Sequence, residues 1–317
     1  MNYSRKDAKS HAFKHLCGLW AATPVPFDAD GAIDEAGFRT NLDHWTRGLG
    51  IANLLVADKE GECFSMTAAE RMRCFDIAAS MAEGRAQIIM CCTDQNLGVV
   101  LELAQHAQAA GGDYISVQAP LLPFQKAQDE TLIRYCEAIA AKVDIGIVLR
   151  VHPDSGYLMS PRLCNRLADL ETVVAITYCA PRALYRELHQ IAADRVLIAA
   201  TSEEEWLEHL IEVGSRTYLA STAALLMQTA RDQRLREYTN AALAGDFDLA
   251  RQISASLDYV REALLTDVPK EKPHAHQKYW QELLGQKGGS VRPPLLGLTE
   301  REKTRIRTAF EASGLLP

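Results

Sequence analysis

The chain has 317 residues, of which 48% are hydrophobic and 24% charged, and its 34 Lys and Arg against 41 Asp and Glu give a net charge of −7. This composition is typical of a soluble globular protein, and the length suits one α/β barrel, which commonly needs about 250 residues or more. The negative charge argues against a nucleic-acid partner, and no apolar run reaches the roughly 20 residues of a membrane span.

Eight short apolar runs follow one another along the chain, and longer amphipathic stretches separate them. The runs comprise residues 18–22, 51–57, 86–92, 113–117, 145–151, 173–178, 196–200 and 216–219. Continuous apolar strands are expected in a parallel sheet that is buried on both faces. Eight strand–helix units predict a (β/α)8 TIM barrel. A doubly wound open sheet is the alternative, but no glycine-rich fingerprint follows the first run.

Several of the amphipathic stretches carry signals for the start of a helix. Asp34 stands near the start of a helix expected over residues 33–48, where an acidic side chain suits the helix dipole. Thr67 precedes the next helix, and Glu70 follows three residues later, which is the spacing of a capping box. Ser202 opens the helix after the seventh run.

The two ends of the chain differ from the strand–helix units. Residues 1–17 are basic and polar, lack the apolar core of a signal peptide, and predict a short N-terminal arm. The barrel is expected over residues 18–240. Residues 241–317 predict a helical appendage of about three helices, with a linker rich in glycine and proline.

The cysteines and the histidines outside the barrel suggest no site. The eight cysteines form no C-x-x-C pair and mostly lie in apolar segments, which favours reduced, buried thiols in a cytoplasmic protein over disulfides or zinc ligands. His11, His274 and His276 are expected at the surface. We expect no cofactor.

Five stretches together resemble a known family. They are PVPFDADGAID at 24–34, GE followed by an ER helix within 61–71, HAQAAGGDYISV at 106–117, AALAGDFDLAR at 241–251 and GGSVRPPL at 288–295. The chain resembles the N-acetylneuraminate lyase and dihydrodipicolinate synthase superfamily of class I aldolase-type lyases. The resemblance implies a barrel with three extra C-terminal helices, a homotetramer or a dimer, and a Schiff base between a barrel lysine and a 2-keto acid such as pyruvate.

The residues that this family uses for its chemistry are replaced here. The Schiff-base lysine of the family ends the sixth strand, and Thr177 stands at that position, where a hydroxyl cannot form an imine. Lys59 and Glu60 replace a threonine pair that binds the keto-acid carboxylate and relays protons. Arg150 replaces a relay tyrosine, and Phe124 aligns with a second one. These agreeing losses predict a remodelled site.

Lys59 is the lysine that stands where barrel active sites form, at the carboxyl end of a strand. Of the other two lysines in the strand–helix units, Lys126 lies on a loop and Lys142 closes a helix. Lys59 is either a nucleophile or an ordinary partner of a neighbouring carboxylate in the turn at residues 58–62.

Further polar residues at strand ends complete the expected site. Arg150 and Lys59 would both face the barrel mouth, where two cations favour a small anionic substrate, and arginine can grip a carboxylate with two parallel bonds. Thr201 and Ser221 are candidates for ligand contacts, although each also suits helix capping. The expected substrate-binding set is Arg150, Thr177, Phe124, Thr201 and Ser221.

Glu60, His152 and Tyr178 are, with Lys59, the candidates for catalytic chemistry, as general acids or bases. The alternatives are an internal salt bridge for Glu60 and an ordinary loop position for His152. A metal site built from strand-end carboxylates and His152 is conceivable, but no spacing among them is diagnostic, and we expect no bound metal.

The sequence therefore predicts a lyase of the aldolase, dehydratase or hydratase type, or an isomerase, that acts on a small anionic carboxylate or 2-keto acid without a Schiff base at Thr177. Two alternatives stay open. One is a non-catalytic relative that binds an anion or a partner chain. The other is an aldolase that uses Lys59 as a relocated Schiff-base lysine. A third possibility is that the chain keeps the family's Schiff-base reaction and that Thr177 is wrongly aligned with the family's lysine. It is disfavoured, because no lysine lies within a few residues of Thr177.

Overall fold

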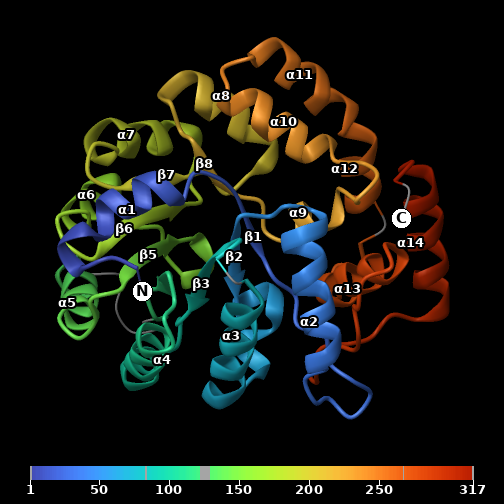
Figure 1. Ribbon diagram of the computed structural model, residues 1–317, viewed down its shortest axis with the longest axis horizontal. Helices are drawn as coiled ribbons and strands as arrows, with labels where there is room; N and C mark the ends of the chain where they lie inside the picture. Colours follow the sequence, from blue (N-terminus) through green and yellow to red (C-terminus); the bar gives the residue numbers. More distant parts are fainter. Residues whose placement is uncertain (1, 83, 122–128, 267, 316–317) are drawn as a thin grey trace. The chain divides into compact units, whose positions relative to one another are not determined.

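The computed structural model describes residues 2–82, 84–121, 129–266 and 268–315. The chain divides into two compact units. Unit 1 comprises residues 1–19 and 87–219, and unit 2 comprises residues 20–86 and 220–317. Figure 1 follows the chain from the N-terminus in blue to the C-terminus in red, and each unit is described by itself.

All eight predicted strands are present, and their ends differ from the expected ones by at most two residues. The strands are β1 (Gly18–Ala22), β2 (Asn53–Val56), β3 (Gln87–Cys91), β4 (Tyr114–Gln118), β5 (Gly146–Val151), β6 (Val173–Tyr178), β7 (Leu197–Ala199) and β8 (Thr217–Leu219). Nearly every strand residue is buried, as expected for parallel strands that are covered on both faces. The alternation of these strands with helices confirms the predicted (β/α)8 barrel class.

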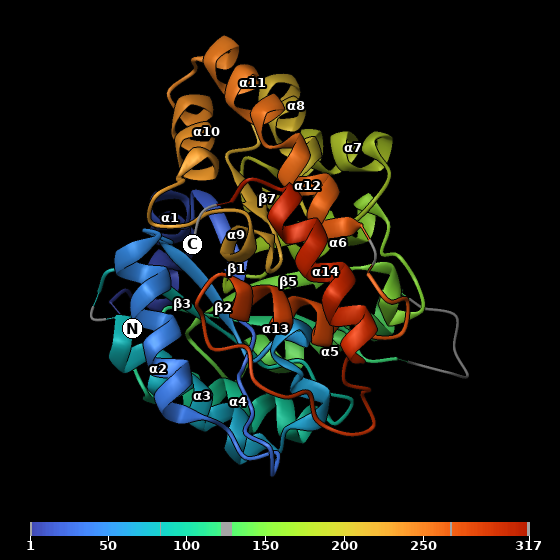
Figure 2. The ribbon, with the colours of Figure 1, turned by 90° about the vertical axis from the view of Figure 1, so that its right-hand side faces the viewer.

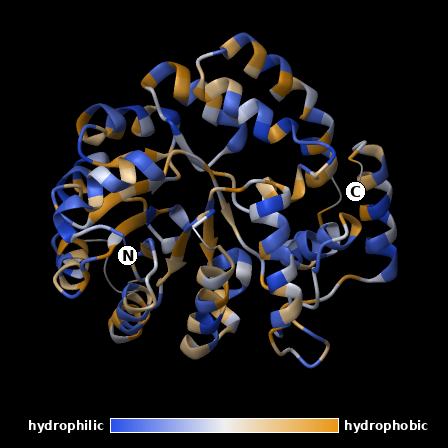
Figure 3. Cartoon of the chain, viewed as in Figure 1, coloured by the Kyte–Doolittle hydropathy of each residue, from blue (hydrophilic) through white to orange (hydrophobic). Residues whose placement is uncertain are grey.

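The helices, apart from α1, which precedes the first strand, lie in the amphipathic stretches where helices were predicted. They are α1 (Ala8–His15), α2 (Glu35–Asp43), α3 (Ala68–Ala82), α4 (Leu97–Ala109), α5 (Asp129–Ala140), α6 (Pro161–Leu167), α7 (Arg182–Ala192), α8 (Glu203–Val213), α9 (Ala223–Leu226), α10 (Arg234–Leu243), α11 (Phe247–Ser256), α12 (Asp258–Leu265), α13 (Pro273–Leu283) and α14 (Glu300–Ala312). Figure 3 shows hydrophobic residues along the strands and a mixture of hydrophilic and hydrophobic positions along the helices. No helix within the described ranges is both long and apolar enough to cross a membrane.

The predicted helix starts are confirmed. The Asp34 side chain accepts the Gly37 N–H at the start of α2, and the Ser202 hydroxyl accepts the Glu205 N–H at the start of α8. Thr67 and Glu70 form the expected capping box before α3, since each side chain accepts the other residue's backbone N–H.

The parallel register of unit 1 brings three polar residues into one row. Strands β3 to β7 pair in chain order. Gln118 of β4 is opposite Arg150 of β5, which is in turn opposite Thr177 of β6. Because successive side chains of a strand alternate between the faces of a sheet, residues paired in this way share one face. The row lies at the carboxyl ends of its strands, where barrel enzymes place their chemistry.

The C-terminal helices belong to unit 2, in which β1 pairs in parallel with β2. Two buried tryptophans tie this unit together: Trp280 Nε1 donates to the Leu226 carbonyl at 3.0 Å, and Trp45 Nε1 donates to Gln286 Oε1 at 2.9 Å. Helix α14 packs on α12 and α13 (Figure 2). The appendage, expected to have about three helices, contains α11 to α14 within its described residues, because a break at Leu257 separates α11 from α12.

Residues 1–17, expected as a short arm, contain the helix α1. Its Ala8 and Ala12, four residues apart, are fully buried, so one small-residue stripe faces the rest of unit 1. The Tyr3 hydroxyl before it accepts the Gly146 N–H at 2.9 Å, at the start of β5. The proposed boundary between barrel and appendage at residue 240 stays a prediction, and α10 runs across it.

Candidate functional site

A polar cluster surrounds Arg150 at the carboxyl ends of β4 and β5. The Arg150 side chain is 10% exposed, and its Nη1 donates to Gln118 Oε1 and, at 3.2 Å, to Asp154 Oδ2. Gln118 Nε2 donates to Asp154 Oδ1 at 2.8 Å. All hydrogen bonds between the guanidinium and described residues thus leave through Nη1, which leaves the Nη2 and Nε edge for a ligand.

Asp154 also contacts His152, on the turn that begins at Pro153 after β5. The Asp154 N–H donates to His152 Nδ1 at 3.1 Å, and Asp154 Oδ1 lies 2.9 Å from the same nitrogen. A neutral imidazole accepts the backbone bond at Nδ1 and carries its proton on Nε2, whereas an imidazolium donates from Nδ1 to the carboxylate. In a third arrangement the neutral ring carries its proton on Nδ1 and donates it to Asp154 Oδ1, so that Nε2 can accept a proton; the contacts are therefore compatible with His152 as a general acid or as a general base.

Thr177 stands beside Arg150 in the row and is 3% exposed. Its Oγ1 has no hydrogen-bond partner among the described residues. A buried hydroxyl without a partner costs free energy, so a ligand or a water molecule gains a hydrogen bond there. The Thr177 hydroxyl is therefore available to a ligand, and its predicted contact with the substrate stays a prediction.

Tyr178, the next residue along β6, faces the other side of the sheet. Its hydroxyl donates to the Met159 carbonyl at 2.9 Å, and burial raises the pKa of the phenol above its ordinary value. The hydroxyl is thus engaged within the fold of unit 1, away from the row that contains Arg150 and Thr177. Its predicted acid–base role stays a prediction without a supporting contact.

The remaining predictions in unit 1 gain less from the structure. Thr201 follows β7 and is half-buried. Phe124, together with Lys126, lies outside the described residues. All eight cysteines are free thiols, as expected. Across the described ranges, no group of three or more His, Cys, Asp or Glu side chains is placed to hold a metal ion.

In unit 2, the loop after β2 contains the other catalytic candidates. Lys59–Gly61 form a 3-10 turn, and Glu62 after it has a φ of 59°, in the left-handed region that non-glycine residues rarely adopt. A Cβ on Gly61 would lie 2.9 Å from the Thr23 carbonyl oxygen, so only glycine permits this close approach to the chain after β1. The loop therefore packs closely against the segment that follows β1.

A buried ion pair holds the end of this loop. Glu62 and Lys278 of α13 are 0% and 2% exposed, and Lys278 Nζ lies 2.5 Å from Glu62 Oε1. Lys278 also donates to the Ser290 carbonyl at 2.6 Å. Burial lowers the pKa of Lys278, and the Glu62 carboxylate opposes that shift. Removing one partner of such a pair is strongly destabilising, because the other charge stays buried.

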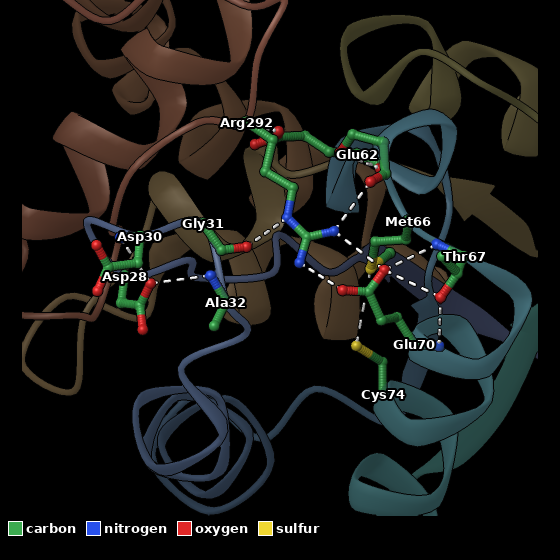
Figure 4. Close-up of polar contacts among 11 residues, drawn as sticks. Asp28, Asp30, Gly31, Ala32, Glu62, Met66, Thr67, Glu70, Cys74 and Arg292 are labelled. Atoms are coloured by element: carbon green, nitrogen blue, oxygen red, sulfur yellow. Dashed lines mark hydrogen bonds and ion pairs between the residues drawn. The ribbon is translucent and has the colours of Figure 1, made fainter.

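Arg292 braces the same loop and the helix after it (Figure 4). Its backbone N–H donates to Glu62 Oε2 at 3.0 Å, and its guanidinium grips both oxygens of Glu70 at 2.6 and 3.1 Å. Nε donates to the Gly31 carbonyl at 2.7 Å. The Arg292 bonds lower the pKa of Glu70 to about 2. These contacts explain the motif residues Glu62, Glu70 and Arg292 as structural partners.

Lys59 and Glu60 make different contacts in this loop. The Lys59 carbonyl is 3.0 Å from His274 Nε2 of α13. Glu62, one of the expected partners of the Lys59 ammonium, pairs with Lys278 instead. Glu60 Oε1 accepts the Ser221 hydroxyl at 2.6 Å, which brings two of the predicted site residues together.

The three histidines expected at the surface are all partly or fully covered, and His11 is half-buried. His276 is 2% exposed, so that prediction is wrong for it, and His274 is half-buried against the loop after β2. The cause is the position of both residues on α13, which lies inside unit 2 between α14 and α9. His274 and Lys278, four residues apart, share one face of that helix and both contact the loop.

Two residues of unit 1 that the sequence did not single out contact Arg150. Asp154 and Gln118 had no assigned role, yet both bind Arg150. Gln118 could have been found, because it ends β4 in the row of Arg150. Lys59 and Arg150 lie in different units, and their expected meeting at one barrel mouth stays a prediction.

Known proteins resemble the chain over nearly its full length. The model of the dihydrodipicolinate synthetase family matches residues 15–313. A 4-hydroxy-tetrahydrodipicolinate synthase of Methanosarcina barkeri is 24% identical, covering 94% of this chain and 99% of that protein. A probable 5-dehydro-4-deoxyglucarate dehydratase of a Bradyrhizobium species is 27% identical, covering 98% and 96%. The crystal structure of dihydrodipicolinate synthase from Aquifex aeolicus superposes with a TM-score of 0.83 at 22% identity, covering 94% and 98%.

Proposed function

The chain belongs to the dihydrodipicolinate synthetase family, and on that premise we propose that it is a lyase for a small anionic carboxylate or 2-keto acid that works without an imine at Thr177. The reaction class is supported by relatives whose names describe a synthase and a dehydratase. Both kinds of reaction make or break a bond next to a carbonyl or carboxylate, and both need proton transfer.

The observation that carries this proposal is the composition of the row in unit 1. Thr177 offers a buried hydroxyl at the end of β6, and the residue paired with it on β5 is Arg150. On β7 the paired residue is Ala199. None of these side chains is a primary amine, so none of them can form an imine with a keto group.

Arg150 is the proposed carboxylate-binding residue. Its Nη2 and Nε edge makes no hydrogen bond to a described residue, and this edge matches the two oxygens of a carboxylate. Asp154 neutralises part of the charge at Nη1 and keeps the buried guanidinium in place before a ligand arrives. The free hydroxyl of Thr177 supplies one more hydrogen bond to the same ligand.

The proposed reaction moves one proton from the carbon next to the keto group and one proton onto a leaving hydroxyl or carbon. A base takes the first proton, and Glu60 is the carboxylate candidate for it. An acid gives the second, and His152, whose ring contacts Asp154, is the candidate for it. In an isomerisation the second proton returns to a neighbouring carbon, which the same groups could serve. A homotetramer or dimer, and a cytoplasmic location, stay predictions.

The test combines turnover with trapping. Purified protein is incubated with a panel of 2-keto acids and hydroxy acids and followed by NMR, then treated with borohydride and mapped by mass spectrometry. The proposal expects turnover of at least one compound, loss of that turnover in Arg150→Gln, and no reduced adduct. An adduct on Lys59 would instead support a relocated Schiff base. Binding without turnover across the panel would support a non-catalytic relative.

A further inference from the structure

The loop that carries Glu60 is fixed by contacts that leave the Glu60 side chain out. Gly61 lies against the Thr23 carbonyl, Glu62 is held by Lys278, and the Lys59 carbonyl meets His274. Every one of these contacts is on a residue next to Glu60 or two residues from it. The loop therefore holds the Glu60 carboxylate at one place without using it as a structural partner.

Hydrogen bonds also fix the backbone around Ser221, which follows β8. Its carbonyl accepts the Ala22 N–H at 2.9 Å, and the preceding Ala220 N–H donates to the Trp20 carbonyl at 3.0 Å. Between these anchors Ser221 has a φ of 49°, in the left-handed region. This strain costs of order 1–3 kcal/mol for a non-glycine residue, and a glycine would adopt the same backbone without it. The backbone alone thus gives no reason for a serine here.

The side chain supplies the reason. The Ser221 hydroxyl donates to Glu60 Oε1 at 2.6 Å, a short bond of the charge-assisted kind. The described residues offer the Glu60 carboxylate no other hydrogen bond or ion pair. A hydroxyl is thus the group that meets the Glu60 carboxylate, whereas cations hold the carboxylates of Glu62 and Glu70.

We propose that Glu60 and Ser221 form the proton relay of this enzyme, which deepens the proposed lyase function and rests on it. The Ser221 oxygen takes the proton from the carbon next to the keto group while its own proton passes to Glu60 Oε1. The electron pair of the broken C–H bond moves toward the keto oxygen and forms an enolate. When the enolate collapses, the proton on Glu60 returns through Ser221 to the carbon or to the leaving oxygen.

The relay gives each residue a separate task. A serine hydroxyl is a weak base by itself, and it becomes effective when a carboxylate takes its proton in the same step. In the proposed relay, the Glu60 carboxylate accepts the proton of the Ser221 hydroxyl, and the Ser221 oxygen takes the proton from the substrate carbon. Ser221 is thus a catalytic residue of the proposed reaction, with the 2-keto acid enolate as the class of intermediate that it serves.

The experiment measures exchange of C3 hydrogens for deuterium in pyruvate, 2-oxobutyrate and 2-oxoglutarate by NMR, for the full chain and four variants. We expect Glu60→Gln, Ser221→Ala and Ser221→Gly each to slow exchange about 100-fold or more, which is within the usual range for a lost general base. Ser221→Gly is informative because it removes the backbone strain together with the hydroxyl. The control is Ser65→Ala, which removes a hydroxyl that donates to the Glu62 carbonyl at 2.8 Å, and its exchange rate should stay within twofold.

A proton inventory in mixtures of light and heavy water separates a relay from a structural hydrogen bond. Two protons in flight give the wild type a curved dependence of rate on deuterium fraction, and Ser221→Ala should give a straight line. A linear wild-type inventory, or a Ser221→Gly variant that keeps its rate, overturns the relay while leaving the lyase proposal in place. Absence of exchange and turnover in the wild type across both panels overturns the lyase proposal, and the relay with it.

Discussion

The strand ends of unit 1 and the loop after β2 in unit 2 use charge in opposite ways. In unit 1, the Asp154 carboxylate contacts three side chains, those of Arg150, Gln118 and His152. These residues lie at the ends of regular strands and in a short turn. In unit 2, the loop at residues 58–62 has left-handed backbone and is held by the fully buried pair of Glu62 and Lys278.

This difference separates charges that a ligand can recruit from charges that it cannot. Asp154 is 29% exposed on its side chain, so water screens its pair with Arg150 and a ligand can compete with it. Glu62 and Lys278 have no such access, and a ligand could reach neither without unfolding the region. The first cluster is therefore suited to binding, and the second to holding the loop that carries Glu60.

The largest effect is expected from breaking the buried pair. Lys278→Met leaves the Glu62 carboxylate buried without its cation and should lower the free energy of unfolding by about 3–5 kcal/mol. Urea unfolding followed by circular dichroism measures the loss. Arg150→Met, the matching change in unit 1, should cost much less because Asp154 stays in contact with water.

The double variant Lys278→Met, Glu62→Leu is the control for this prediction. It removes both charges, so it should recover a large part of the stability lost in the single variant. A double variant as unstable as Lys278→Met would show that packing rather than charge holds the loop.

A smaller effect follows from His276 on the same helix. Burial lowers its pKa to about 4 from an ordinary 6.5, so the folded protein prefers the neutral ring. The unfolded chain binds the proton first as pH falls, so this stability is complete above pH 6.5 and is lost between pH 6.5 and 4. The shift corresponds to about 3 kcal/mol at the low end of the window.

The measurement compares unfolding free energies at pH 7 and pH 4.5 for the wild type and for His276→Leu. The variant should show a shallower loss toward acid. Equal slopes for the wild type and His276→Leu would contradict the prediction.

The smallest change in stability, and the most useful for function, is expected from Asp154→Asn. The substitution keeps the shape of the side chain and removes the negative charge beside Arg150, so stability should change by less than about 1 kcal/mol. Binding of pyruvate, measured by calorimetry, should become several-fold tighter because the guanidinium has lost its competing anion. Unchanged or weaker binding would remove Arg150 as the proposed carboxylate-binding residue.

The strands were predictable because parallel strands covered on both faces leave continuous apolar runs, such as residues 173–178 of β6. Helix starts were predictable where capping residues stand at fixed spacing, as Thr67 and Glu70 do. Helix α1 was missed because only Ala8 and Ala12 are buried in a polar segment, and two alanines give a weak periodic signal.

Site residues were predictable where their position on a strand decided their place. Arg150 and Thr177 lie at the strand ends where the apolar runs placed them, and their roles in binding stay predictions. The partners that define their state were missed, since Asp154 lies in a turn whose shape the strand pattern does not show. The pairing of Lys278 with Glu62 could not be predicted for another reason. The two residues are far apart in the sequence and meet only in the folded chain, so no local sequence pattern links them.

The contact between Arg292 and Glu62 joins residues 230 positions apart. A nascent chain released in order from its N-terminus can therefore pair β1 with β2 long before the loop after β2 receives its brace. Closing a contact over so long a segment is entropically costly, and only the finished C-terminal region provides the groups that repay it. The loop that presents Glu60 would thus be among the last parts of unit 2 to take its final form, and a chain cut short before residue 292 would lack the contacts that Arg292 makes with it.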